Sequence, residues 1–181
     1  MTIFIDLAAS WIVRVSMITV MLGISVTMND ALYKTAQHAN TNAALASTAD
    51  IVYRDLNMAG YNISGYFYYA FGTTTSNDMT FYGDLNGGGV PETIRYYTSL
   101  DASTGLYKLY RSVNRENSGT PLLLGKDFKS VKFQYYKYNG VLTTNYWEVA
   151  SVRIKLEQQI PAATSGFTTA LNDFRVYPAN L

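Results

Sequence analysis

The side chains that most often carry enzymatic or metal chemistry are scarce in this chain of 181 residues. It has a single histidine, His38, and no cysteine, so a thiolate metal site and a cysteine nucleophile are excluded. The phosphate-binding loop, the dinucleotide-binding glycine pattern, the zinc-protease motif and the nucleophile elbow are all missing. We therefore expect a protein without enzymatic activity and without a cofactor.

Asp84 and Asn86 are the only residues whose spacing suggests a metal site. They place side-chain oxygens at alternate positions of a glycine-rich segment, as at the start of an EF-hand calcium loop. The pattern then departs, because Gly88 stands where a third oxygen ligand is needed and Arg95 where the closing acid would be. We expect a plain glycine-rich loop, with calcium binding as the weaker alternative.

An apolar stretch near the N-terminus carries two charges that need an explanation. The stretch from Leu7 to Val26 is about as long as the roughly 20 residues that cross a bilayer. It contains Arg14, and Asp6 directly precedes it. A charge in the middle of a membrane costs roughly 2.5 to 3.5 kcal/mol, so both charges should find a neutralising partner.

Asp6 and Arg14 are too far apart to pair with each other on one helix. Eight residues correspond to about 12 Å of rise and roughly 80° of rotation. We expect pairing between staggered neighbours, in which Asp6 of one subunit meets Arg14 or the free amino terminus of the next and sets the register. The alternative is a lone membrane helix whose Arg14 extends to the lipid headgroups.

Small residues on the same segment support close contact between helices. Ala9, Ser16 and Gly23 recur at intervals of seven and therefore lie on nearly one side of a helix. In apolar surroundings, helices associate through such small residues, because these let the backbones approach. We expect this line, with Asp6 and Arg14, to form an assembly interface between copies of the chain.

The composition is rich in tyrosine and poor in charge. There are 16 tyrosines, charged residues make up 15% of the chain, and the formal net charge is +1. Charge this sparse suits an exterior that is covered by neighbours, and it leaves no basic stripe for nucleic acid. Tyrosine clusters such as Tyr66 to Tyr69 and Tyr146-Trp147 could stack on a glycan or line an interface, although β-sheet propensity alone also favours them.

One long helix must position these residues. From Met1 to Ala59 the only helix-breaking residue is Gly23, and Gly60 is suited to a left-handed C-terminal cap. Residues 1–30 are apolar nearly all round, which predicts burial in lipid or among other helices. Residues 31–60 carry one apolar stripe that should pack against the rest of the chain, formed by Leu45, Ala49, Val52, Leu56 and Ala59.

The remaining residues, 61–181, predict a β-rich head. Alternating apolar and polar residues predict six strands, near 79–82, 93–98, 106–113, 131–135, 152–157 and 174–177. Asn139-Gly140 predicts a two-residue type I′ hairpin between two of them. Loops are expected at 84–92, 114–121 and 161–169. The predicted fold class is α+β, a long N-terminal helix packed against an antiparallel sheet.

This layout resembles the type IV pilin-like proteins, and the order of short motifs in the head is similar to that of PilW-like minor pilins and pseudopilins. The matching segments are Arg54-Asp55-Leu56, Ala59-Gly60-Tyr61, Phe81 through Asp84-Leu85-Asn86, Ile94-Arg95-Tyr96-Tyr97, Leu109-Tyr110-Arg111 and Val131 to Tyr136. The resemblance implies a helix that anchors the subunit in the inner membrane before assembly and forms the filament core afterwards.

Two features depart from that family. Pilins usually carry a glutamate at position five after a basic leader, whereas this sequence begins at Met1 and has an aspartate at position six. The resemblance passes the role of the neutralising acid to Asp6. It leaves two expectations open, a leader ahead of Met1 or another route to the surface.

We expect a structural subunit that polymerises with copies of itself, through its N-terminal helix, into an extracellular pilus-like filament or tube on the cell surface. Nucleic acid is not an expected partner. The alternative is a membrane-anchored or tip-located adhesin, a binding module whose tyrosine-rich head contacts a surface glycan.

Overall fold

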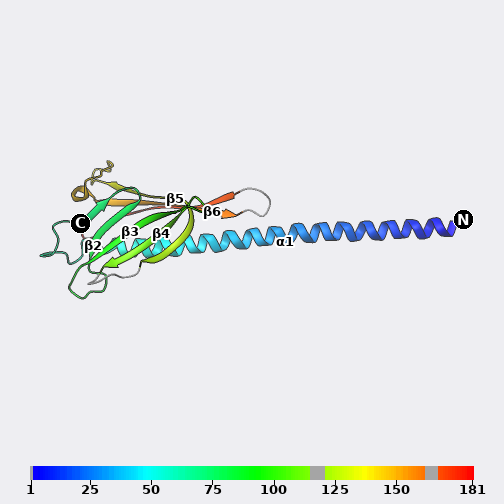
Figure 1. The fold of residues 1–181 in the computed structure, drawn as a ribbon, viewed down its shortest axis with the longest axis horizontal. Helices are drawn as coiled ribbons and strands as arrows, with labels where there is room; N and C mark the ends of the chain where they lie inside the picture. Colours follow the sequence, from blue (N-terminus) through cyan, green and yellow to red (C-terminus); the bar gives the residue numbers. More distant parts are fainter. Residues whose placement is uncertain (1, 115–120, 162–166) are drawn as a thin grey trace.

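The computed structural model of the chain describes residues 2–114, 121–161 and 167–181. It has an α+β fold, which confirms the predicted class: one long helix, α1 (Thr2–Asn57), packs against a curled antiparallel sheet (Figure 1). The strands are β1 (Phe71–Thr74), β2 (Asp78–Gly83), β3 (Glu92–Asp101), β4 (Leu106–Asn114), β5 (Leu122–Tyr136), β6 (Ser151–Pro161) and β7 (Phe167–Val176). A short 3-10 helix, η1 (Tyr146–Glu148), precedes β6.

The sheet is a simple meander in which every strand pairs with its sequence neighbours, in the order β1 to β7. Alternation along the strands sends one set of side chains towards α1, as in β2, where Met79 and Phe81 are buried. The pairing of β6 with β7 begins at Pro161 and Phe167, seven residues before the predicted strand near 174. In the loop expected at 161–169, residues 161 and 167–169 are therefore strand, and residues 162–166 lie outside the described part of the chain. Residues 115–120 of the loop expected at 114–121 also lie outside it.

Helix α1 has two unlike halves. At about 1.5 Å per residue its 56 residues span roughly 84 Å, so its front half extends far beyond the head (Figure 1). The rear half packs against β5, β6 and β7. All five residues of the expected apolar stripe are buried, with exposed fractions of 8% or less: Leu45, Ala49, Val52 and Leu56 in α1, and Ala59 in the turn that follows it. Their partners in the core include Phe81, Ile94, Leu109, Phe133, Ile154 and Leu156.

The helix ends at Asn57, two residues before the predicted end. Asn180, near the C-terminus, donates its side-chain amide to the Asn57 carbonyl at 3.2 Å and satisfies one of the carbonyls that a helix end leaves open. Gly60 has the expected positive φ, 82°, and its N–H donates to the Tyr82 carbonyl at 2.9 Å. The predicted boundary at residue 60 thus lies in the turn between α1 and the head.

The connection from β5 to β6 differs from the prediction. A tight turn does lie at Asn139-Gly140, but only Gly140 has a positive φ, 80°, so the turn is not type I′. The Gly140 N–H donates to the Lys137 carbonyl at 2.9 Å and the Lys137 N–H to the Val141 carbonyl at 2.8 Å, as in a three-residue hairpin with a glycine bulge. After this turn the Thr143 N–H donates to the Tyr135 carbonyl, which holds the segment beside β5. The chain then runs through η1 before β6 starts.

A buried carboxylate joins α1 to the sheet. Asp55 interrupts the apolar stripe, and its side chain is only 3% exposed. Its Oδ2 accepts a hydrogen bond from the Tyr96 hydroxyl on β3 at 2.6 Å and one from Arg111 Nε on β4 at 2.5 Å. Burial, together with the neighbouring Asp55 charge, raises the pKa of Tyr96 well above its usual value, so the phenol stays a donor. The charge of Asp55 is therefore compensated where a lone ion would be costly.

We predict that Asp55→Ala lowers the free energy of unfolding by about 3 to 5 kcal/mol, because it leaves the Arg111 guanidinium half-buried without its counter-ion. Tyr96→Phe, which removes only one hydrogen bond to a charged group, should cost about 1.5 to 3 kcal/mol. The measurement is urea unfolding of the full chain in mild detergent, followed by near-ultraviolet circular dichroism. Asp78→Ala is the matched control, because the Asp78–Arg95 pair is more exposed and should contribute at most about 1 kcal/mol. Equal losses from Asp55→Ala and Asp78→Ala would contradict the prediction.

Candidate assembly interface

The front half of α1 exposes apolar side chains on every side. From Ile3 to Met28 each large hydrophobic residue is between 41% and 81% exposed, with Phe4 at the upper end and Val15 at the lower. By length and composition α1 is apolar enough to cross a membrane, and its most apolar part has no buried residue. A continuous apolar surface of this extent needs lipid or protein around it.

Asp6 and Arg14 project from this apolar surface. Both residues are exposed, and within the described residues neither has a hydrogen bond or an ion pair. Arg14 lies beside Leu7 and Trp11, which line a shallow hollow with it. The spacing along a continuous helix keeps the two charges about 12 Å apart in rise, so a neutralising partner must come from outside the described chain.

The line of small residues is also exposed and has no intrachain use. Ala9, Ser16 and Gly23 all lie on the uncovered half of α1. A Cβ added at Gly23 would meet nothing within 4 Å, so packing within the chain does not require glycine at this position. Glycine in a helix costs about 1 kcal/mol relative to alanine.

Polar side chains among these apolar residues bond back to the helix. The Thr19 hydroxyl donates to the Val15 carbonyl and the Thr27 hydroxyl to the Gly23 carbonyl, each at 2.9 Å. These hydroxyls therefore need no water, and they fit a helix that is surrounded by apolar groups.

The glycine-rich loop that follows β2 uses its own oxygens. Asp84 is buried; its Oδ1 accepts the Gly88 N–H at 3.0 Å, and its Oδ2 accepts the Gly89 N–H at 2.7 Å and the Asn62 amide at 3.1 Å. Burial opposes ionisation, but these hydrogen bonds outweigh it and hold the pKa of Asp84 below its usual value. Asn86 likewise accepts from Gly88 at 2.7 Å.

The side-chain oxygens of the candidate calcium ligands therefore stabilise the loop itself. Asp84 Oδ1 and Oδ2 and Asn86 Oδ1 all accept hydrogen bonds from it. Within the described residues, no group of three or more His, Cys, Asp or Glu side chains is placed to hold a metal ion. This geometry favours the plain hairpin loop over the calcium alternative.

The tyrosine clusters divide between the core and the surface. Tyr96 and Tyr135 are buried, and burial raises the pKa of both hydroxyls. Tyr97 stacks on Tyr110 with ring centres 5.3 Å apart. The clusters Tyr66 to Tyr69 and Tyr146-Trp147 come together at the end of the head. Tyr69 contacts Tyr146 edge to face with ring centres 5.4 Å apart, and Tyr146 contacts Trp147 in the same way at 4.8 Å.

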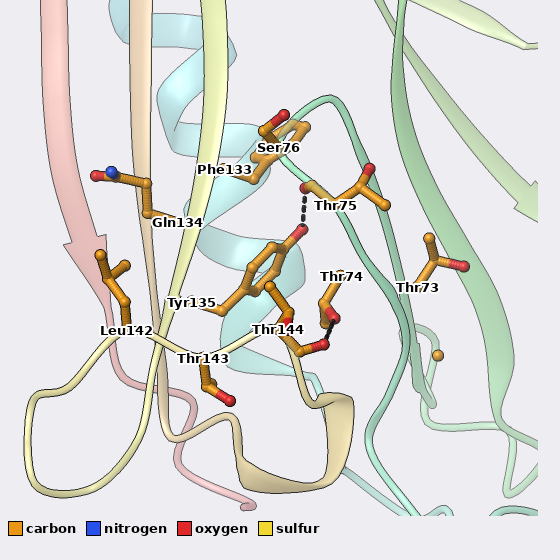
Figure 2. Close-up of a pocket in the computed structure, with 11 residues that line it drawn as sticks. Thr73, Thr74, Thr75, Ser76, Phe133, Gln134, Tyr135, Leu142, Thr143 and Thr144 are labelled. Carbon is orange, nitrogen blue, oxygen red and sulfur yellow. Dashed lines mark hydrogen bonds between the residues drawn. The ribbon is translucent and has the colours of Figure 1, made fainter.

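Beside these rings lies a cleft of about 880 Å³ between the β1–β2 turn and the second half of β5 (Figure 2). Two hydrogen bonds frame it: the Tyr135 hydroxyl donates to the Thr75 carbonyl at 2.9 Å, and the Thr74 hydroxyl donates to the Thr144 carbonyl at 2.7 Å. Its walls are mostly hydroxyl-bearing, with Thr73, Thr74, Thr75, Ser76, Tyr135, Thr143 and Thr144 among its eleven lining residues (Figure 2).

Two contacts of the structure were not predicted from the sequence. The first is the contact of Asp55 with Tyr96 and Arg111, for which a signal existed, because an acid on an apolar stripe must be paired. The second is the meeting of residues 66–69 with 146–147, which depends on contacts far apart in the chain and had no local signal.

Comparison with known protein families and with curated protein sequences finds no match for this chain. Its function is therefore inferred from the exposed half of α1 and from the surface of the head.

Proposed function

We propose that this protein is a structural subunit that polymerises with copies of itself, through the front half of α1, into an extracellular pilus-like filament or tube. The observation that carries the proposal is the uncovered apolar surface from Ile3 to Met28, on a helix that extends far beyond its own head (Figure 1). Before assembly this segment spans the inner membrane. After assembly, the same segments of neighbouring subunits cover one another and the heads lie outside.

Assembly explains more of α1 than membrane attachment does. A lone membrane anchor requires apolar side chains, but it requires neither a charge of each sign nor a glycine on its surface. A staggered bundle uses all three, because Asp6 neutralises Arg14 or the amino terminus of a neighbour and Gly23 lets two backbones approach. The role proposed for the chain is mechanical and involves no catalytic step.

The second candidate function is a binding head, carried by the same α1 at a filament tip or in the membrane. The specific observation in its favour is the exposure of Tyr68 (98%), Tyr66 (59%) and Trp147 (53%) on one end of the head. Aromatic rings that are not covered by the chain itself are frequent in binding surfaces. Stoichiometry separates the two functions, since a shaft subunit is present in many copies and a tip subunit in few.

We predict that Asp6→Ala abolishes filaments while the head stays folded. Removing the acid leaves a positive charge in apolar surroundings without its partner. The measurement is electron microscopy of material sheared from cells that produce the full chain, with circular dichroism of the purified variant as the check on folding. Normal filaments from Asp6→Ala would remove Asp6 from the assembly mechanism.

A charge exchange identifies the partner of Asp6. If Asp6 pairs with Arg14 of a neighbour, the double variant Asp6→Arg/Arg14→Asp restores filaments that each single variant lacks, because the pair is only reversed. If Asp6 instead pairs with the amino terminus, the double variant stays without filaments and Arg14→Ala assembles. Filaments from Asp6→Arg alone would contradict both pairings.

We predict that Gly23→Leu reduces filament yield more than Ser25→Leu does. Both positions are exposed on the apolar half of α1, and they point to nearly opposite sides of the helix. Gly23 has open space around it, so the single subunit tolerates the larger side chain, whereas a close helix contact does not. Yield is measured as sheared filament protein per cell, with total protein level as the control. Equal yields would show that Gly23 is not at a close contact.

A further inference from the structure

We infer that the end of the head carries a binding site for a neutral oligosaccharide. The inference rests on the second candidate function, the binding head, and names the class of ligand that it binds. The platform of the site, called the aromatic surface below, consists of Tyr66, Tyr68, Tyr69, Tyr146 and Trp147. The aromatic surface and the hydroxyl-lined cleft of Figure 2 together form the proposed site.

The rings are exposed but held in place. Tyr69, Tyr146 and Trp147 are 48%, 37% and 53% exposed, and their edge-to-face contacts fix the ring orientations relative to one another. Between them and β2 lies a second cleft of about 530 Å³, with the Tyr82 ring on its wall. Phe67 stacks on Tyr82 with ring centres 3.9 Å apart. The apolar C–H face of a sugar ring packs well on such fixed aromatic faces, and little ordering is needed on binding.

Hydrogen-bonding groups stand next to the rings. Both clefts are lined by Gly72 and Thr73, so the aromatic surface continues into the hydroxyl-lined cleft. Thr73 is exposed, and its hydroxyl has no hydrogen-bond partner within the described residues. Gln134 lines the same cleft (Figure 2). The Thr143 hydroxyl is instead used within the chain, where it donates to Glu148 and accepts the Asn145 N–H, each at 3.1 Å. Hydroxyl and amide groups can both donate and accept, which matches the hydroxyls of a sugar.

The site has no net charge to select a charged ligand. Residues 56–77 and 138–147 contain no Asp, Glu, Lys, Arg or His. Glu148, which directly follows residues 138–147, pairs with Lys137 at 2.8 Å and accepts hydrogen bonds from Thr143 and Asn145. An anionic polysaccharide, a nucleic acid or an anionic lipid would find no complementary charge here. A neutral oligosaccharide is the ligand that uses both the rings and the hydroxyls.

The two segments are also fixed to each other. The Thr74 hydroxyl donates to the Thr144 carbonyl at 2.7 Å, and the Phe133 N–H donates to the Ser76 carbonyl at 2.9 Å. These bonds hold the β1–β2 turn against β5 and the segment that follows it (Figure 2). The site is therefore assembled before a ligand arrives.

The chain supplies its own probe of this site. Its two tryptophans are Trp11 on α1 and Trp147 in the aromatic surface, so Trp11→Phe leaves Trp147 as the single tryptophan. The full-length Trp11→Phe protein, dispersed in a detergent without a sugar headgroup, is titrated with cellohexaose, maltohexaose and chitohexaose. We expect a saturable change in Trp147 emission with at least one of them. No saturable change with any of the three would overturn the inference.

Three variants in the same background test the residues. Tyr69→Ala should weaken binding about tenfold or more, because it removes a central ring. Thr73→Val keeps the side-chain shape, removes the exposed hydroxyl and should weaken binding several-fold without lowering the unfolding midpoint. Tyr138→Ala, which removes a ring that is 99% exposed but lies on the turn after β5, is the matched control and should bind as before.

Two further outcomes would also overturn the inference. One is equal binding by Tyr69→Ala, and the other is displacement of the sugar by dextran sulfate, which would indicate an anion site. The titration uses dispersed single subunits, so it does not depend on filament formation. Sugar binding without filaments would mean that the filament proposal has failed. Filaments without sugar binding would mean that the oligosaccharide proposal has failed.

Discussion

The carboxylate of Asp55 fixes how the helix and the head are joined. The apolar stripe of α1 repeats at steps of three and four residues, so apolar packing alone would also accept a helix shifted by one turn. A shift would take Asp55 away from the Tyr96 hydroxyl and Arg111 and leave a buried charge on each side of the contact. The pair therefore selects one axial position and one rotation of α1, and through them the direction in which the exposed front half leaves the head.

That selection matters for a subunit whose proposed partners are copies of itself. In a helical bundle, the register between neighbouring α1 segments also sets where the heads meet. A head that could slide by one turn, about 5.4 Å, would not repeat the same contacts along a filament. The contacts of Asp55 at the rear of α1 set the position of the head on its own helix, and the proposed pairing of Asp6 at the front sets the position of one helix relative to the next. Together they would determine where neighbouring heads meet.

The sequence was informative where structure depends on residues close together in the chain. The uninterrupted helix, the buried stripe from Leu45 to Ala59 and the alternating strands follow from local periodicity, and the structure has them. Strand β1 (Phe71–Thr74) was not predicted, because four residues interrupted by Gly72 are too few to show an alternating pattern, although Phe and Thr favour strands. Its pairing with β2 establishes the strand. The type I′ prediction at Asn139-Gly140 was wrong, because Asn139 keeps a negative φ and accepts the Val141 N–H instead.

The meeting of the two aromatic segments had no local signal at all, since it joins residues nearly 80 positions apart across a curled sheet. The chain segments 66–69 and 146–147, which carry the aromatic surface, also lie at the opposite end of the molecule from the N-terminus of α1 (Figure 1). Burial of the front half of α1, whether in lipid or among other helices, therefore does not require any of these rings to be covered. The surface proposed for polymerisation and the surface proposed for recognition are separated by the length of the molecule, so the two proposals are compatible in one subunit.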